Sequence, residues 1–465
     1  MNAKKTTFFL LPVIYYSIII MVGNSCAQVG MPTGGPRDSI PPTLIKSSPP
    51  IRTTHFSGNR ITLTFDEYVH VENVQQNLLV SPTPRVNPNV DYKFREVTIK
   101  LRDTLLPNTT YSIQLGNAIQ DVNENNPYPN FTYVFSTGSY IDSLTLNGKV
   151  IVAETGLPDS TLIAELYNDL SDSVVFKTKP KYVSRIDKEG NYNFSYLAAG
   201  TYQLFALRDE SGTKLYNNPK QLFAFADSTI VINKENKTAP VLYAYSEEKE
   251  TPTTSTSKQE KFLKFSTSII NAHQDLLTPL EINFNHPLKN SAAAFANIKD
   301  TLFNNIATKI STDTLGKKYK IEFNAKPSQK YLLVINKELA IDTAGVALLK
   351  NDTIPFTMKN ESEYGSIRLN FTNLQKFKHP VLQFVSRNEI VASFELPSAI
   401  FEQKLIAPGE YTLRILDDEN GNKAWDPGHY SPQKKNLQKQ PEKIYNISQS
   451  LNIKANWDNI RDIVL

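Results

Sequence analysis

The chain has 465 residues, of which 40% are hydrophobic and 21% charged, and a formal net charge of +4. So small a charge, carried by scattered basic residues, excludes a nucleic-acid footprint, and we expect no nucleic-acid partner. The length predicts three or four domains, and a single cysteine means that each must be stable without a disulfide. The 22 Tyr, 24 Phe and 28 Pro favour short strands joined by proline-bearing loops. We therefore expect an all-β protein.

The N-terminal residues have the order of an export signal. Lys4 and Lys5 precede an apolar run over residues 8–22, and small or polar residues follow before Cys26. The apolar run is shorter than the ~20 residues needed to span a bilayer. We therefore expect residues 1–25 to be a cleaved signal peptide rather than a retained membrane helix.

Residues 23–26 (Gly-Asn-Ser-Cys) resemble the lipobox of bacterial lipoproteins, although Gly23 stands where that family usually has Leu or a similar residue. The resemblance implies that Cys26 carries a lipid and attaches the chain to a membrane. An ordinary secretory peptide with an incidental cysteine is the alternative. Residues 26–39 are rich in Gly and Pro and lack an apolar period, so we expect a flexible tether there.

Residues 40–138 contain short runs of alternating apolar and polar residues, separated by turn residues at intervals typical of an antiparallel sandwich. The segment resembles the bacterial Ig-like domain of surface proteins at residues 41–42, 61–67, 106–111, 119–121 and 135–138. Such domains act as spacers or binding platforms, and the resemblance implies no catalytic residues. We interpret Asp66 and Glu67 as a solvated strand end rather than a catalytic pair.

Residues 145–245 have a different pattern. Residues 187–204 resemble the transthyretin-like module of the carboxypeptidase regulatory-domain type, which implies a seven-stranded sandwich with a structural or binding role. Asp187 and Gly190 mark a hairpin turn within this segment. Residues 246–259 are polar and charged without any period, so we expect a linker that divides the chain into halves.

The two halves resemble each other. Residues 200–214 align with residues 409–423 at a constant offset of 209, and residues 107–115 align with residues 327–335 at an offset of 220. This repetition predicts a second, divergent Ig-like domain over residues 260–358 and a second transthyretin-like domain over residues 364–465. The predicted fold is thus a tandem array of antiparallel β-sandwiches in an extended arrangement.

One segment of the fourth domain suggests metal chemistry. Asp418, Asn420 and Asn422 occupy positions 1, 3 and 5 of a loop, and Asp426 occupies position 9. Closely spaced carboxylate and amide oxygens are ligands that Ca²⁺ favours, so these four residues form a possible calcium site. The alternative is an Asn-Gly turn whose side chains bond their own backbone. No other cofactor is indicated.

Three loop aromatics suggest ligand binding. Trp425, Tyr430 and Tyr216 could stack on a sugar ring, although Trp425 could equally serve as a lid over the sandwich core. The six histidines show no metal-ligand spacing, and we find no nucleophile elbow, phosphate-binding loop or second cysteine. We therefore expect no enzymatic activity.

These features predict a lipoprotein of the cell envelope, held in the outer membrane by its N-terminal lipid. Repeated Asp-Ser/Thr-apolar triplets, at residues 38–40, 103–105, 142–144 and 352–354, resemble the O-glycosylation site of exported Bacteroidetes proteins. The expected function is that of a spacer, scaffold or adhesion module with an envelope protein as partner. The alternative is a glycan-binding accessory protein of a nutrient-uptake system. Residues 27–30 do not indicate which face of the membrane the protein occupies.

Overall fold

The computed structural model describes residues 38–248, 262–289, 295–432 and 437–465. The regular structure of these residues is almost entirely β, which confirms the predicted all-β class. They form four separate hydrophobic cores, drawn from residues 56–135, 144–244, 263–358 and 367–465, which we call modules 1 to 4 in chain order. The expected signal peptide, Cys26 and most of the expected tether and linker lie outside the described residues.

Module 1 is a β-sandwich whose strands alternate as the sequence predicts. Ile61, Leu63 and Phe65 of one strand are fully buried, while the threonines between them face outward. The sheets have the orders β1-β2-β6-β5, β4-β7-β9 and β3-β8. The strands are β1 (Leu44–Ser48), β2 (Arg60–Phe65), β3 (Val69–Val71), β4 (Leu79–Ser81), β5 (Asn89–Lys93), β6 (Glu96–Lys100), β7 (Thr110–Gly116), β8 (Ile119–Asp121) and β9 (Phe131–Ser136).

Module 3 repeats this topology with different lengths. Its sheets have the orders β18-β20-β24-β23 and β19-β26-β25-β21-β22. Strands β7 and β25 begin 220 residues apart, which is the offset found in the sequence. The strands are β18 (Phe265–Thr267), β19 (His273–Gln274), β20 (Leu280–Phe284), β21 (Ala296–Lys299), β22 (Asn305–Ile306), β23 (Thr308–Thr312), β24 (Lys318–Phe323), β25 (Lys330–Ile335) and β26 (Asp352–Met358).

Module 2 is a sandwich of two sheets with the orders β13-β10-β17 and β12-β11-β14-β15, with β16 also paired to β14. Most pairs are antiparallel, but β10 and β17 are parallel. The strands are β10 (Leu144–Val152), β11 (Leu162–Tyr167), β12 (Tyr182–Arg185), β13 (Asn191–Leu197), β14 (Gly200–Arg208), β15 (Phe223–Phe225), β16 (Ile230–Ile232) and β17 (Leu242–Ala244).

Module 4 has the same topology, with sheet orders β30-β27-β33 and β29-β28-β31-β32 and a parallel pair of β27 and β33. Strands β14 and β31 begin 209 residues apart, as the repeat in the sequence requires. The strands are β27 (Gly365–Thr372), β28 (Pro380–Ser386), β29 (Glu389–Glu395), β30 (Ile400–Ile406), β31 (Gly409–Asp417), β32 (Lys443–Ile453) and β33 (Asp458–Val464).

Helices are few and short in the described residues: α2 (Val74–Asn77), α3 (Val174–Lys177), η1 (Glu361–Glu363) and η2 (Leu374–Lys376). The 3₁₀ turn η1 joins modules 3 and 4 and is capped by Asn360, whose side chain accepts the backbone N–H of Ser362. None of these helices has the length and apolar character required to cross a bilayer.

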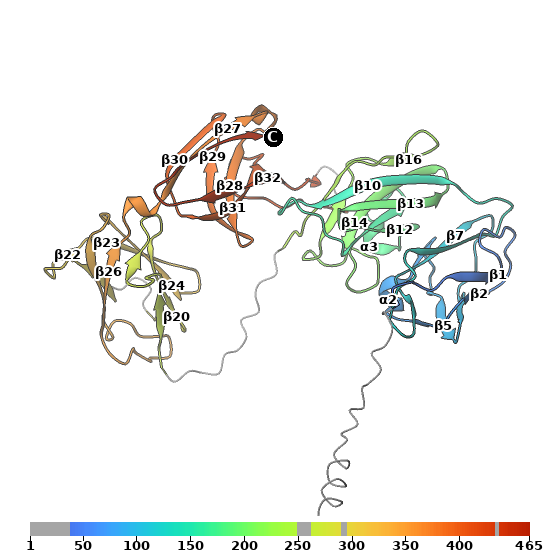
Figure 1. Cartoon of the computed structure of the whole chain (residues 1–465), viewed down its shortest axis with the longest axis horizontal. Coiled ribbons are helices and arrows are strands. Elements are labelled where there is room, and N and C mark those ends of the chain that lie inside the picture. Colours follow the sequence, from blue (N-terminus) through green and yellow to red (C-terminus); the bar gives the residue numbers. More distant parts are fainter. Residues whose placement is uncertain (1–37, 249–261, 290–294, 433–436) are drawn as a thin grey trace, which may run out of the picture.

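The modules lie in a row, but not in chain order. In Figure 1 the sequence of modules along the row is 3, 4, 2, 1, so that module 4 is the neighbour of module 2. Modules 1 and 2 meet where β4 lies against β12: Val183 donates its backbone N–H to the Ser81 hydroxyl at 3.1 Å, and Thr83 donates to the carbonyl of Lys181 at 3.1 Å. The extended arrangement therefore depends on a contact between the second and fourth modules that chain order does not predict.

Candidate functional site

The loop that follows β31 is closed by hydrogen bonds to its own backbone. Asp418 is 1% exposed, and its two carboxylate oxygens accept the N–H groups of Gly421 and Lys423, each at 2.7 Å. Gly421 and Lys423 both have positive φ, at 77° and 68°. The glycine tolerates this left-handed conformation without strain, so it fixes the turn at this point.

The remaining residues of the possible calcium site bond to one another. Asp426 accepts the side-chain amides of Asn420 and Asn422 on the same oxygen, Oδ2, the latter at 2.9 Å. The buried Glu442 accepts the N–H of Glu419 at 2.9 Å and that of Asp426 at 3.0 Å. Burial raises the pKa of Glu442, and the carboxylates of Asp418 and Asp426 add to the effect.

The structure thus brings Asp418, Asn420, Asn422 and Asp426 together in one loop. Their bonds are those of the turn interpretation, with amide nitrogens rather than oxygens directed at Asp426. In the described part of the chain, no group of three or more His, Cys, Asp or Glu side chains is arranged to hold a metal ion. The bonds favour the turn, and calcium binding at this loop stays the other of the two alternatives that the sequence offers.

Trp425 and Tyr216 are equivalent residues of the repeat, again 209 positions apart. Trp425 packs against Val381, Leu416 and Ile444 on the outer face of its own module, and its indole N–H donates to the Glu442 carbonyl at 2.7 Å. Tyr216 stacks on Phe223 with ring centroids 4.2 Å apart and is 4% exposed. Both side chains therefore act as lids over the outer face of a sheet.

Tyr430 is inserted from module 4 into module 2. Its ring lies 4.9 Å from that of Phe225, 5.2 Å from Phe223, 5.7 Å from Phe205 and 6.0 Å from Phe176. The residue is 5% exposed, and its hydroxyl donates to the Asp172 carbonyl at 3.0 Å. Neither Tyr430 nor Tyr216 offers a ring face to a ligand in this arrangement, because both are buried in the contact between modules 2 and 4.

Glu247 organises the polar side of this contact. Its carboxylate accepts the backbone N–H of Tyr430 at 3.1 Å and the hydroxyl of Tyr216 at 3.2 Å, and it lies 2.9 Å from Nδ1 of His429. The sequence assigns Glu247 to the linker, because a run of polar residues gives no signal of a tertiary contact. The structure instead places Glu247 in the contact between modules 2 and 4. We call this contact the joint; its centre is Tyr430 with the aromatic rings around it and Glu247.

Further bonds extend the joint along both modules. Gln440 donates its amide to the Phe225 carbonyl at 3.0 Å and to the Asp227 carboxylate at 2.8 Å. Asn446 donates to the Thr155 carbonyl at 2.9 Å, and Lys443 lies over the ring of Tyr243 at 4.7 Å. The backbone of module 4 approaches the Tyr245 ring so closely that a Cβ on Gly428 would lie 2.6 Å from that ring. Apolar packing and hydrogen bonds together make the contact between modules 2 and 4 a specific one.

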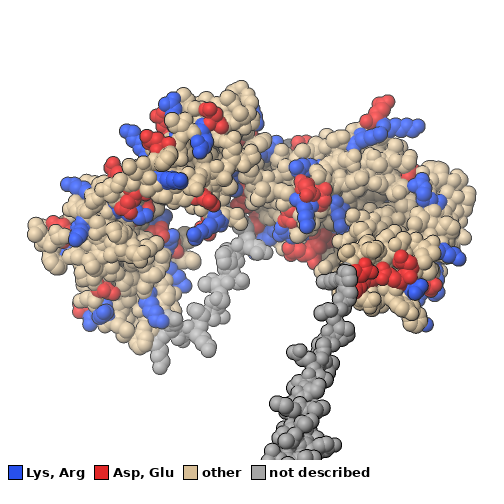
Figure 2. Space-filling view, in the orientation of Figure 1, with Lys and Arg blue, Asp and Glu red and all other residues tan. Residues whose placement is uncertain are grey.

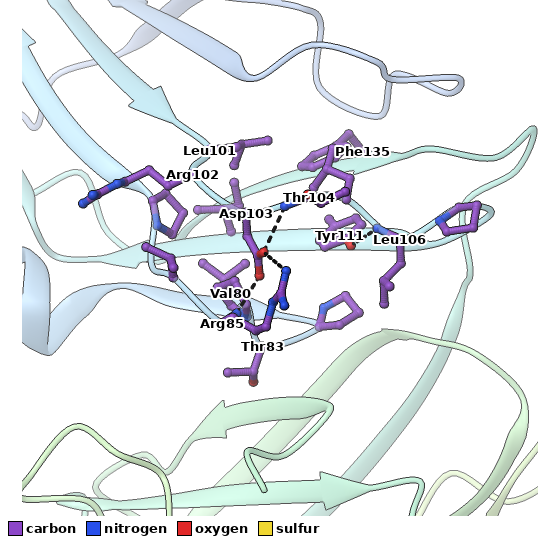
Figure 3. A pocket seen from close by; sticks show the side chains of 17 residues that line it. Val80, Thr83, Arg85, Leu101, Arg102, Asp103, Thr104, Leu106, Tyr111 and Phe135 are labelled. Atoms are coloured by element: carbon purple, nitrogen blue, oxygen red, sulfur yellow. Dashed lines mark hydrogen bonds and ion pairs between the residues drawn. The ribbon is translucent and has the colours of Figure 1, made fainter.

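A pocket of about 440 Å³ opens in module 1 between the loops of residues 82–88 and 101–107 (Figure 3). Tyr111 and Phe135 line it and are stacked with centroids 5.2 Å apart. Asp103 accepts the backbone N–H groups of Arg85 and Thr104, at 2.7 Å and 2.9 Å. The bond from Arg85 holds the pKa of Asp103 below its usual value, so this carboxylate is a loop-closing acceptor rather than a general acid.

Glu67 lies among other acids, which the sequence alone does not indicate. Burial raises its pKa, and the carboxylates of neighbouring acids raise it further; these are Asp121, Asp66, Asp38 and Glu124. Its partner in sequence, Asp66, is exposed and accepts the backbone N–H of Thr43 at 2.7 Å. The pair follows the end of β2, where the sequence places it, and Asp66 also fastens the incoming chain to this strand end.

Residues 38–137 match the family described as the bacterial Ig-like domain. This match covers module 1, where the sequence resemblance was found. No curated protein sequence matches the chain.

Solved structures give only distant likenesses. The Bacillus anthracis TIE protein is 12% identical, with 93% of this chain and 75% of that one covered, at a TM-score of 0.16. BcpA, the major pilin subunit of Bacillus cereus, is 10% identical, with 70% and 99% covered, at a TM-score of 0.17. The BSP domain of a biofilm associated protein is 8% identical, with 82% and 93% covered, at a TM-score of 0.17. At these scores the likenesses carry no argument about function.

Proposed function

We propose that this protein is a non-enzymatic lipoprotein of the bacterial cell envelope that acts as a scaffold or adhesion module, attached to the outer membrane through Cys26. The observation that carries the proposal is the joint. It holds modules 2 and 4 together out of chain order, so that four sandwiches form a row with a defined spacing instead of a flexible string. Defined spacing is what a scaffold or a presented adhesion surface requires.

The sequence supplies the support for the attachment. The expected export signal, residues 1–25, ends directly before Cys26, which is the only cysteine of the chain. The family matched by residues 38–137 supports a bacterial surface role for module 1. Glycan binding through Trp425, Tyr430 and Tyr216 is not part of the proposal, because the joint and the sheet faces use these rings.

Two measurements test the proposal. Cells that express the full chain are labelled with a radioactive fatty acid, and we expect incorporation into the wild type and none into the variant Cys26→Ala. Equal labelling of the two, or none in either, would contradict the lipid attachment.

Small-angle X-ray scattering of the mature chain tests the fixed row. We expect a single elongated particle whose dimensions do not change with ionic strength, because the aromatic part of the joint is apolar. A broad distribution of dimensions at every salt concentration would contradict the scaffold.

A further inference from the structure

One end of module 1 exposes large apolar side chains. Phe94 is 67% exposed, Tyr68 is 55% exposed and Tyr92 is 52% exposed. The rings of Phe94 and Tyr68 lie 6.1 Å apart. Val122, which is 52% exposed, donates its backbone N–H to the Tyr68 carbonyl at 3.1 Å. We call these four residues the apolar end; such contiguous exposure is uncommon on a soluble domain and marks interaction sites.

The conformation of Phe94 adds to the cost of this exposure. Phe94 and Arg95 form the two-residue turn between β5 and β6, and Phe94 has a φ of 56°. This left-handed region favours glycine and is rare for a bulky residue. The corresponding turn between β23 and β24 of module 3 places Gly316 in that region, with a φ of 66°. Module 1 thus has an exposed, strained phenylalanine in a two-residue turn, whereas the longer turn of module 3 has a glycine in this conformation. Strain of this kind supports a role for Phe94 outside the folding of the module.

Cations lie against the apolar end. Lys93 lies 5.4 Å from the ring centre of Phe94, and Arg95 lies 5.5 Å from that of Tyr68. Tyrosine rings with cations at their rim suit the boundary between lipid and water, where the ring is buried and the polar groups stay wet. Acids also gather here, next to the start of the described chain in Figure 2; they are Asp38, Asp66, Glu67 and Glu124. These acids disfavour an anionic surface.

The position of the apolar end in the chain identifies its partner. Asn126 donates its side-chain amide to the Asp38 carbonyl at 3.1 Å, in the same loop as Val122. Asp38 therefore lies close to the apolar end, and it follows Cys26 by twelve residues. Twelve residues reach at most roughly 40 Å when fully extended. A lipid on Cys26 would thus hold a bilayer within reach of the apolar end, at the high effective concentration that a short tether gives.

We propose that the apolar end rests on the bilayer to which the chain is anchored, with Phe94 and Tyr68 in the interfacial region. This inference depends on the proposed function, which supplies the anchor. Docking of the apolar end fixes the orientation of module 1, so that the row of modules starts from the membrane at a defined angle. Apolar insertion drives the contact and the neighbouring acids repel anionic lipids, so the contact is stronger on a zwitterionic surface than on an anionic one.

The single cysteine allows a direct test. The mature chain, residues 26–465, is coupled through the Cys26 thiol to a maleimide lipid in phosphatidylcholine vesicles that contain brominated acyl chains. Phe94→Trp reports contact at the apolar end. Leu315→Trp is the matched control, because Leu315 is 69% exposed in the corresponding turn of module 3. The wild-type signal, which comes from Trp425 and Trp457, is subtracted from both.

We expect brominated lipid to quench the added tryptophan of Phe94→Trp at least two-fold more than that of Leu315→Trp. Equal quenching of the two, or quenching of neither, would overturn the proposal. Vesicles with added phosphatidylglycerol should reduce the quenching, and an increase would overturn the apolar mode of docking. Since the coupling is chemical, these results do not depend on whether cells acylate Cys26, and fatty-acid labelling tests that step separately.

Discussion

Modules 2 and 4 share one topology but use the outer face of the second sheet in different ways. In module 4 this face is small, with Val381, Leu416 and Ile444 lying beneath the module's own Trp425. In module 2 the face is a large aromatic cluster that includes Phe205, Phe223 and Phe225. The lid of module 2, Tyr216, does not complete the cluster, and Tyr430 of module 4 fills the remaining space.

Equivalent residues explain this difference. Phe205 of module 2 corresponds to Arg414 of module 4, and Glu165 corresponds to Gln383, because β11 and β28 pair with β14 and β31 in the same register. Arg414 donates to the Gln383 side chain at 2.7 Å, so the face of module 4 is polar at its centre. Module 2 thus presents a surface that accepts a side chain from module 4. The face of module 4 is polar and does not accept a side chain from module 2 in return.

Removal of the Tyr430 ring is the most direct test of the different roles of modules 2 and 4. Tyr430→Ala takes a buried ring out of the aromatic cluster, and truncation of a buried aromatic side chain costs ~3–5 kcal/mol. We expect modules 2 and 4 to unfold in one transition in the wild type and in separate transitions in this variant, as measured by scanning calorimetry. Tyr430→Phe, which loses only the hydroxyl bond to Asp172, should cost ~1 kcal/mol and keep the transitions coupled. Coupled unfolding of Tyr430→Ala would show that the ring does not join the modules.

Glu165 provides a second difference between modules 2 and 4, in the way that stability depends on pH. This carboxyl group is fully buried, Tyr167 donates to its Oε2 at 3.1 Å, and its Oε1 has no partner. Burial raises its pKa well above the usual value, and Asp209 adds to the shift. The folded state favours the protonated form of Glu165. The stabilising contribution of this group to the unfolding free energy is therefore present below the ordinary pKa of Glu, and it is lost as the pH rises through the raised pKa.

Glu165→Gln places the residue of module 4 in module 2 and should abolish this dependence. We expect the unfolding free energy of the wild type to fall relative to the variant between pH 4 and pH 8, by ~1.4 kcal/mol for each unit by which the pKa is raised. The reciprocal Gln383→Glu sets a carboxylate beside Arg414 and should show no such fall. Urea titrations across this pH range measure both, and parallel wild-type and Glu165→Gln profiles would be inconsistent with a protonated Glu165.

The sequence predicts the modules better than their contacts, for a physical reason. Alternation of apolar residues decides which side of a strand faces the core, as in β2, and the offset of 209 predicts that β14 and β31 are equivalent strands. The offset also relates Tyr216 to Trp425, although amphipathic rings suit a lid and a ligand platform equally. No local sequence pattern indicates that Tyr430 enters another module, because Tyr430 and its partner Glu247 are 183 residues apart in the chain. Glu247 was missed for the same reason.

The loops after β14 and β31 should differ in their dependence on one aspartate. Asp418 accepts two backbone N–H groups at 2.7 Å, whereas Asp209 accepts only that of Lys214, at 3.0 Å. The bonds to Asp418 are partly buried, and hydrogen bonds to a charged group contribute ~1.5–3 kcal/mol. We expect Asp418→Ala to destabilise module 4 by about that amount and Asp209→Ala to destabilise module 2 by less, in chemical denaturation. A larger effect at Asp209 would reverse the comparison and would point to its ion pair with Lys214.

Calcium should have the smallest effect on stability. Its addition is a further way to compare the loops after β14 and β31. Asp418 and Asp426 already accept hydrogen bonds from the loop itself, so we expect the thermal unfolding of module 4 to be the same in EDTA and in millimolar CaCl₂. A bound ion would stabilise the folded state by ~2.7 kcal/mol at a concentration one hundred times its Kd. A rise in the midpoint that is lost in Asp426→Asn but not in Asp209→Asn would therefore establish the calcium site. Without such a rise, the loop owes its shape to the Asp418 carboxylate and to Gly421, in the same way that its equivalent in module 2 depends on Asp209 and Gly212.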